Sequence, residues 1–303
     1  MTEIERYKNF EGLIKDAELG KLQQSRILIA GCGAGGPVAL HLARVGVGTK
    51  DFGGIILADP DKVEWRNIGR PPYLFSDAQE GTAKVYALES ILKKINPEVN
   101  LGTIGEGITL GNVDRLVVNS DVVVEMVDVS QPQITFALHR ACGTHRKPLV
   151  TGLDLGDNII MYVFDYRAEN SATYVKFLGL PEDLRQEDFA SFNPLAIAAQ
   201  FIIGKQEKTF VGREEALSYY GDGFFVSEDN IKAVFEKLPR DKATINMIES
   251  ILGGQLEHIA QSDIASQLLG TAQALVIKQL ILGNPVKSAP SPIRIYLSEI
   301  VSV

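Results

Sequence analysis

A glycine-rich turn between a short apolar run and a helical run constrains the fold of this chain more than any other feature. Residues 26–31 read RILIAG, residues 32–36 read CGAGG, and PVALHLARVG follows. Pro37 suits the first turn of a helix, where its missing N–H costs nothing. A second apolar run, IILAD at 55–59, completes a strand–helix–strand unit, and parallel sheets are built from such units. The sequence therefore predicts an α/β fold.

The remaining periodic segments extend this unit into a doubly wound sheet. Apolar residues at helical spacing predict helices at 82–95, 131–143 and 263–282. Short apolar runs predict strands at 121–127, 148–152, 158–165 and 292–297. The stretch 166–255 is less regular, and we expect it to leave the sheet as a largely helical insertion. The prediction is one Rossmann-like domain over 1–303, with a mostly parallel sheet and the 166–255 insertion before the last helix and strand.

Charge and cysteine usage argue against several classes of function. The net charge is −8 and no basic stripe occurs, which argues against a nucleic-acid partner. Cys32 and Cys142 are the two cysteines and form no C-x-x-C, so neither a zinc site built from cysteines nor a disulfide framework is expected. The first residues contain no apolar region of a signal peptide, and no uninterrupted run of membrane length occurs. We expect a cytoplasmic protein without a membrane partner.

The glycine turn itself carries a nucleotide-binding pattern. Gly31, Gly33 and Gly36 form G-x-G-x-x-G between a predicted strand and a predicted helix, which is the context that the motif requires. Glycines let the backbone approach phosphate closely, and the helix N-terminus offers free N–H groups. Asp59 ends the second strand, where a carboxylate accepts hydrogen bonds from ribose hydroxyls. These residues alone fit NAD as well as ATP.

The residues after Asp59 distinguish between NAD and ATP as the expected ligand. The run from Asp59 to Arg70 has the pattern D-x-D-x-V-E-x-x-N-x-x-R, Lys84 stands in GTAK, and Asp128 ends DVVVEMVD. These motifs resemble the adenylation motifs of the ubiquitin-activating (UBA/ThiF/MoeB) superfamily. The opening segments ERYKNF and LGKLQQSRILIAGCG, and the late segment LLGTAQALVIKQLILG, are also similar to that family. The resemblance covers residues 1–165 closely and 263–297 loosely.

The resemblance implies an ATP- and Mg²⁺-dependent adenylyltransferase that acts as a homodimer. Its substrate would be a carboxylate, at the C-terminus of a small ubiquitin-like sulfur carrier or of a peptide. Attack on the α-phosphorus of ATP gathers negative charge that cations must neutralise. By resemblance, Asp59 would bind the ribose, Asp128 would hold Mg²⁺, and Asp61 would lie near the nucleotide or the metal. The residues in contact with the triphosphate would be Asn67, Arg70 and Lys84.

The chain departs from the family pattern at several positions. Asn9 stands where many members have an arginine that reaches the partner's triphosphate, although Lys8 is adjacent. Pro71 and Val129 replace a usual glutamine and asparagine. No cysteine occurs from 143 to 303, where thioester-forming members have one, so we expect the reaction to proceed without an enzyme thioester.

Two other functions remain open from the sequence. An NAD-dependent oxidoreductase would explain the glycine turn and Asp59, but would leave Asn67, Arg70, Lys84 and Asp128 without a role. A non-catalytic nucleotide-binding member of the family would explain the loss of the arginine at Asn9.

Overall fold

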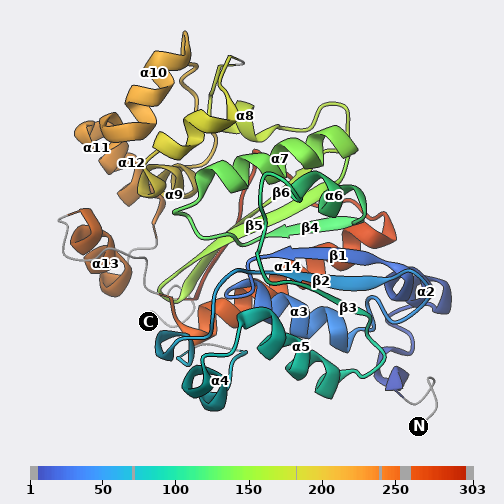
Figure 1. Cartoon of the computed structure of the whole chain (residues 1–303). Helices are drawn as coiled ribbons and strands as arrows, with labels where there is room; N and C mark the ends of the chain where they lie inside the picture. Colours follow the sequence, from blue (N-terminus) through green and yellow to red (C-terminus); the bar gives the residue numbers. More distant parts are fainter. Residues whose placement is uncertain (1–5, 70–71, 182, 239–240, 253–260, 298–303) are drawn as a thin grey trace.

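A seven-stranded sheet forms the centre of the molecule (Figure 1). A computed structural model describes residues 6–69, 72–181, 183–238, 241–252 and 261–297. The sheet has the order β3-β2-β1-β4-β5-β6-β7. Its strands are β1 (Arg26–Ala30), β2 (Gly54–Ala58), β3 (Leu101–Ile104), β4 (Val122–Glu125), β5 (Pro148–Leu155), β6 (Asn158–Asp165) and β7 (Ile293–Tyr296).

The sheet is mostly parallel. Strands β1 to β5 run in one direction, with Ala30 of β1 beside Ala58 of β2 and Glu125 of β4 at the carboxyl ends. A tight turn at Gly156 then reverses the chain, so β6 is antiparallel to β5, and β7 is antiparallel to β6. This arrangement confirms the predicted Rossmann-like, mostly parallel sheet.

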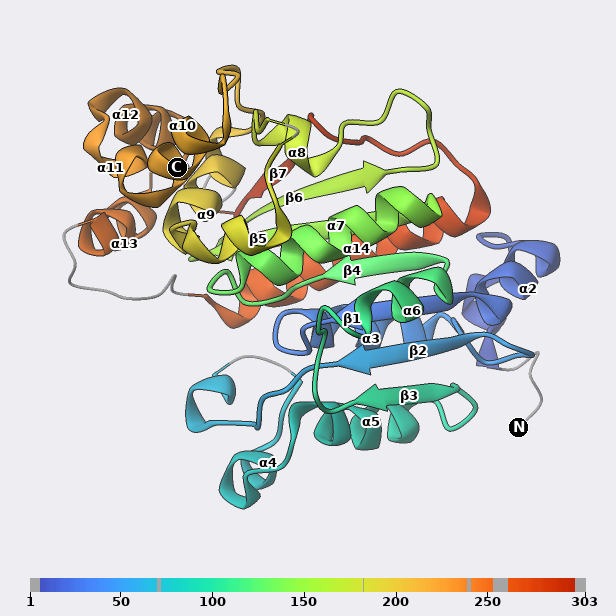
Figure 2. The same cartoon turned by 45° about the horizontal axis from the view of Figure 1, so that its top comes forward.

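Helices cover both faces of the sheet (Figure 2). One face packs against α3 (Gly35–Arg44), α5 (Lys84–Ile95) and α14 (Asp263–Leu282), and its core includes Val38, Leu88 and Ile277. The other face packs against α6 (Val113–Val118) and α7 (Pro132–His145), and its core includes Leu116 and Leu138. Alternating apolar side chains of the strands therefore enter two separate cores, as in other doubly wound folds.

The chain between β6 and α14 lies outside the sheet and is largely helical in its described part. Figures 1 and 2 both place the helices from α9 (Pro194–Ile203) to α13 (Lys242–Leu252) together, beyond the β5–β6 side of the sheet. Phe136 of α7 stacks on Phe189 with ring centroids 3.8 Å apart, which joins this segment to the sheet-covering helices. The elements are α8 (Tyr174–Phe177), η3 (Gln186–Ser191), α9 (Pro194–Ile203), α10 (Arg213–Ser218), η4 (Tyr219–Gly223), α11 (Phe224–Val226), α12 (Glu228–Lys237) and α13 (Lys242–Leu252).

Within the described residues, α14 alone has the length and hydropathy that would let a helix cross a membrane. Its buried side chains, such as Leu269 and Ile277, pack against the sheet and α3. At Gly270 an added Cβ would lie 2.4 Å from the Cβ of Pro37, so the two helices are in close contact there. These contacts are those of a core helix.

Several short elements were absent from the sequence-based expectation. They are α2 (Asp16–Gln24), β3, α4 (Phe75–Glu80) and α6. The helix predicted at 82–95 begins two residues later, at Lys84, because Ala83 is extended with ψ of 136° and caps the helix. Ala83 is extended because it forms an isolated antiparallel β-bridge with Lys62, so the helix begins after it.

Candidate active site

The glycine turn joins β1 to α3 at the carboxyl edge of the sheet. Gly31 has φ of +92°. A Cβ added there would lie 2.0 Å from the carbonyl oxygen of Met126, the residue that follows β4. A Cβ at Gly36 would lie 2.6 Å from Cδ of Pro72. Close packing against the Met126 carbonyl and the Pro72 ring therefore requires these two glycines, whether or not a nucleotide is bound. Gly33 lies between them and is half-buried.

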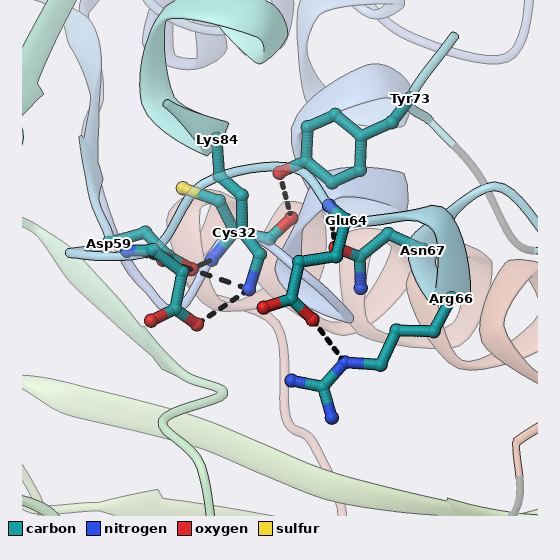
Figure 3. A network of polar contacts seen from close by, with 8 residues as sticks. Cys32, Asp59, Glu64, Arg66, Asn67, Tyr73 and Lys84 are labelled. Atoms are coloured by element: carbon teal, nitrogen blue, oxygen red, sulfur yellow. Dashed lines mark hydrogen bonds and ion pairs between the residues drawn. The ribbon is translucent and has the colours of Figure 1, made fainter. Parts of the chain in front are cut away.

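Asp59 connects the glycine turn to the end of β2 (Figure 3). Its Oδ2 accepts a hydrogen bond of 2.7 Å from the backbone N–H of Cys32, and its Oδ1 accepts one of 2.9 Å from the N–H of Asp61. The residue is 5% exposed. Burial raises the pKa of the Asp59 carboxyl above its ordinary value, while the charge of Lys84 and the two N–H groups oppose that rise.

Lys84 brings a cation to the same place from the first turn of α5. Its Nζ lies 2.7 Å from Oδ2 of Asp61 and 3.9 Å from Oδ1 of Asp59. The Lys84 side chain is 11% exposed, and its backbone N–H donates to the carbonyl of Asp61 at 2.9 Å. The structure thus brings together three of the predicted site residues, Asp59, Asp61 and Lys84. The ammonium of Lys84 contacts both carboxylates.

Asn67 lies close by, in the 3₁₀ turn η2 (Trp65–Asn67). Its Oδ1 accepts a hydrogen bond of 2.9 Å from the N–H of Glu64, which closes the turn. Its Nδ2 donates no hydrogen bond to the described part of the chain, so this amide remains a potential donor to a ligand. Arg66 pairs with Glu64 at 2.5 Å, and both side chains are largely exposed. Arg70 and Pro71 lie outside the described residues.

Asp128 stands three residues after β4, at the same edge of the sheet as Asp59. It is exposed, and its Oδ1 accepts a hydrogen bond of 2.8 Å from the N–H of Ser130. No contact joins it to Lys84, Asp61 or Asp59 among the described residues. The loop that carries it, which includes Val129, therefore presents a solvent-facing carboxylate.

A second acid, Glu125, precedes that loop at the end of β4, and no sequence motif had pointed to it. It is buried and accepts hydrogen bonds from the hydroxyls of Thr135 (3.0 Å) and Thr151 (2.6 Å) and from the N–H of Val127 (3.2 Å). Burial raises its pKa. An acid inside the apolar run VVVEMV was the signal that could have identified it.

The N-terminal residues dock at the other end of the helices. Arg6 donates to Asn96 at 3.0 Å and pairs with Glu98 at 2.6 Å, just beyond the end of α5. Lys8 and Asn9 are exposed in the 3₁₀ turn η1 (Lys8–Phe10). Since α5 starts at Lys84 in the site and rises about 1.5 Å per residue, its far end lies about 18 Å away. Lys8 is thus distant from its own chain's site.

The ThiF family model matches residues 7–295. The chain belongs to the ThiF family. It is 34% identical over 148 residues to the adenylyltransferase and sulfurtransferase MOCS3 of Anopheles gambiae, covering 48% of this chain and 32% of that protein. It is 31% identical over 134 residues to the SAMP-activating enzyme E1 of Haloferax volcanii, covering 44% of this chain and 47% of that enzyme. The chain therefore spans less than half the length of these curated relatives.

Solved structures with the same fold cover nearly the whole ThiF chain. PaaA superposes with a TM-score of 0.61 at 16% identity, over 98% of this chain and 71% of PaaA. Escherichia coli MccB, solved with AMPCPP and MccA, superposes with a TM-score of 0.58 at 18% identity, over 98% of this chain and 69% of MccB. MccB has also been solved with ATP. At these identities the likeness establishes the fold, and the predicted family is confirmed by the family match.

Proposed function

We propose that this chain catalyses ATP-dependent adenylation of a carboxylate, giving an acyl-adenylate and pyrophosphate. The observation that carries the proposal is the contact of Lys84 with Asp61 and Asp59 at a glycine turn, in a member of the ThiF family. The curated relatives are named for adenylyl transfer or for activating a protein carrier. An ammonium held at the end of a glycine turn is placed where polyphosphate charge must be neutralised.

In the proposed reaction, the protein binds and orients the nucleotide and stabilises charge. An oxygen of the substrate carboxylate attacks the α-phosphorus of ATP, the bond from that phosphorus to the bridging oxygen breaks, and pyrophosphate leaves with the electron pair. Asp59 would accept hydrogen bonds from the ribose, and Lys84 would exchange Asp61 for a phosphate oxygen. Asn67 would donate its free amide to the triphosphate, and Arg70 would add a second cation. The chain thus orients the nucleotide and stabilises the charge that develops.

The charges of the described site fit a divalent cation. Asp59 and Asp61 supply two carboxylates against the single ammonium of Lys84, and the triphosphate adds further negative charge. Asp128 would hold Mg²⁺, because its carboxylate is exposed and oxygen ligands suit this ion. When bound, Mg²⁺ would neutralise phosphate oxygens and withdraw charge from the leaving pyrophosphate.

We propose that the acyl-adenylate is the product released, without an enzyme thioester. Cys32 and Cys142 are both buried, and burial raises the pKa of each thiol, which disfavours the thiolate. The substrate would be the C-terminus of a small ubiquitin-like carrier or of a peptide. One curated relative is named for activating SAMP, and MccB was solved with MccA.

We propose that the chain acts as a homodimer, and the position of Lys8 supports this proposal. This exposed residue lies near the far end of α5, so it could replace the family's arginine only in the site of a second copy. We further propose that residues 1–303 act as one adenylation domain in the cytoplasm, with 166–255 shaping the acyl-substrate pocket. Sedimentation of the purified chain tests the dimer: a monomer at micromolar concentration would contradict it.

ATP–pyrophosphate exchange tests the reaction. With Mg²⁺ and a panel of synthetic carboxyl-terminal peptides, exchange of labelled pyrophosphate into ATP is expected, and Asp128→Ala should abolish it while circular dichroism stays unchanged. ATP binding without exchange by any peptide or carrier would favour a non-catalytic role. Thermal stabilisation by NAD with no response to ATP would replace the proposal with an oxidoreductase.

A further inference from the structure

The segment that follows β2 crosses back over the glycine turn and is fixed to it at two points. Pro72 packs against Gly36 so closely that an added Cβ would meet its ring at 2.6 Å. The hydroxyl of Tyr73 donates a hydrogen bond of 2.9 Å to the carbonyl oxygen of Cys32. Tyr73 is buried, and Figure 3 shows its ring beside the turn, with the hydroxyl directed at Cys32.

The two peptide groups around Cys32 are therefore both held from outside the turn. Asp59 accepts from the N–H of Cys32, which fixes the peptide before it. Tyr73 holds the carbonyl of Cys32, which fixes the peptide after it. In a planar trans peptide the C=O and the N–H point in opposite directions. Holding the Cys32 carbonyl toward Tyr73 thus aims the N–H of Gly33 away from Tyr73.

That N–H donates to no acceptor within the described residues, although Gly33 is half-buried. We propose that Tyr73 is a positioning residue, which orients the Cys32–Gly33 peptide so that the Gly33 N–H donates to the triphosphate of the bound nucleotide. This inference rests on the proposed function, because it needs ATP at the glycine turn. Tyr73 touches neither the reacting carboxylate nor the phosphorus; it acts through the backbone of the turn.

Tyr73→Phe removes the hydroxyl and keeps the ring. One neutral hydrogen bond contributes about 1 kcal/mol, so the dissociation constant for MgATP in calorimetry should rise about fivefold. Adenosine, which has no phosphate, should bind the variant and the wild type equally. The matched control is Tyr220→Phe, because the buried hydroxyl of Tyr220 also donates to a backbone carbonyl, that of Leu178, at 2.9 Å. This control should leave MgATP affinity unchanged.

Equal MgATP affinity in Tyr73→Phe and the wild type would overturn the role of Tyr73. An equal loss of adenosine and MgATP affinity would also overturn it, because it would indicate general damage to the site. If the wild type binds no MgATP at all, the proposed function fails, and this inference fails with it.

A measurement on the wild type avoids any folding defect of the variant. Cys-Gly occurs twice in the chain, at Cys32–Gly33 and at Cys142–Gly143. Labelling cysteine carbonyls with ¹³C and glycine amides with ¹⁵N therefore selects two amide signals, and that of Gly143 in α7 is an internal reference. MgATP should move the Gly33 signal and slow its hydrogen exchange, while Gly143 stays unchanged. An unmoved Gly33 signal at saturating MgATP would overturn the proposal.

Discussion

The ammonium of Lys84 lies 2.7 Å from the carboxylate of Asp61, and the two side chains differ sharply in exposure. That of Lys84 is 11% exposed and that of Asp61 is 62% exposed. The pair links the end of β2 to the first turn of α5. Because the Asp61 side chain is largely exposed and that of Lys84 is not, we expect that a phosphate oxygen could replace this carboxylate without any movement of α5. In the proposed reaction, the triphosphate would therefore compete with Asp61 for the ammonium of Lys84.

Lys84→Met should lower the rate of ATP–pyrophosphate exchange by at least about a hundredfold, because the site loses a cation aimed at developing charge. It should also reduce stability, since the buried carboxylate of Asp59 loses its nearest positive charge. Exchange assays and urea unfolding of the same samples measure both effects. Lys84→Arg keeps the charge and is the matched control. Exchange at the wild-type rate in Lys84→Met would contradict the assigned role.

Glu125→Gln should change the pH dependence of stability. Burial raises the folded-state pKa of Glu125 above its ordinary value of 4.5, so the folded state favours the protonated acid. The stability that the protonated Glu125 contributes is therefore lost as pH rises from the unfolded pKa through the folded pKa. The amide of the variant does not titrate, so the free energy of unfolding of the variant relative to the wild type should increase with pH. Urea unfolding at pH 5 and pH 8 checks this, and a difference that falls with pH would contradict it.

Gly31→Ala should destabilise the fold by about 3 kcal/mol or more, since the methyl group would meet the Met126 carbonyl in a left-handed backbone region. Gly221→Ala is the control, because nothing lies within 4 Å of a Cβ at that position. The control should change stability by less than about 1 kcal/mol. Chemical denaturation compares the two, and similar losses in both variants would show that close packing at Gly31 is not the cause.

Fluorescence offers a direct reporter of the site, because Trp65 is the single tryptophan of the chain. It is 57% exposed and its ring centroid lies 4.9 Å from that of Phe75, in the segment that carries Asn67. Emission should be that of a solvent-exposed indole and should change on addition of MgATP. Trp65→Phe provides the blank. An unchanged spectrum at saturating MgATP, with binding established by calorimetry, would show that this segment keeps its environment when the nucleotide binds.

The sequence predicted the parts of the fold in which local pattern and burial agree. The strands around the glycine turn are short, mostly apolar and mostly buried, and Asp59 follows directly where the apolar run ends. Strand β3 was missed because LGTI is brief, contains a glycine and lies half-buried at the sheet edge. Such a segment carries neither the alternation nor the continuous apolar run by which strands are recognised.

Of the predicted site residues, Asp59, Asp61 and Lys84 contact one another, but the contacts themselves were not predictable from the sequence. The family resemblance assigned Lys84 to phosphate, and nothing in the sequence indicated that Asp61 and Asp59 would be its partners. The hydrogen bond from Tyr73 to Cys32 joins residues 41 positions apart. It depends on how the segment after β2 folds back, which no local pattern encodes. The capping role of Asn67 was equally hidden, because an amide can serve a ligand and its own turn at once.

The direction of β7 has a practical consequence. This strand is antiparallel to β6, so it runs with β1, and Tyr296 pairs with Asn158 at the edge of the sheet where the glycine turn lies. A polypeptide fused behind Tyr296 would begin on the side of the glycine turn, where it would compete for space with the acyl substrate that we propose. A fusion ahead of Arg6 would start from the opposite edge, beside Glu98, and would leave that approach open.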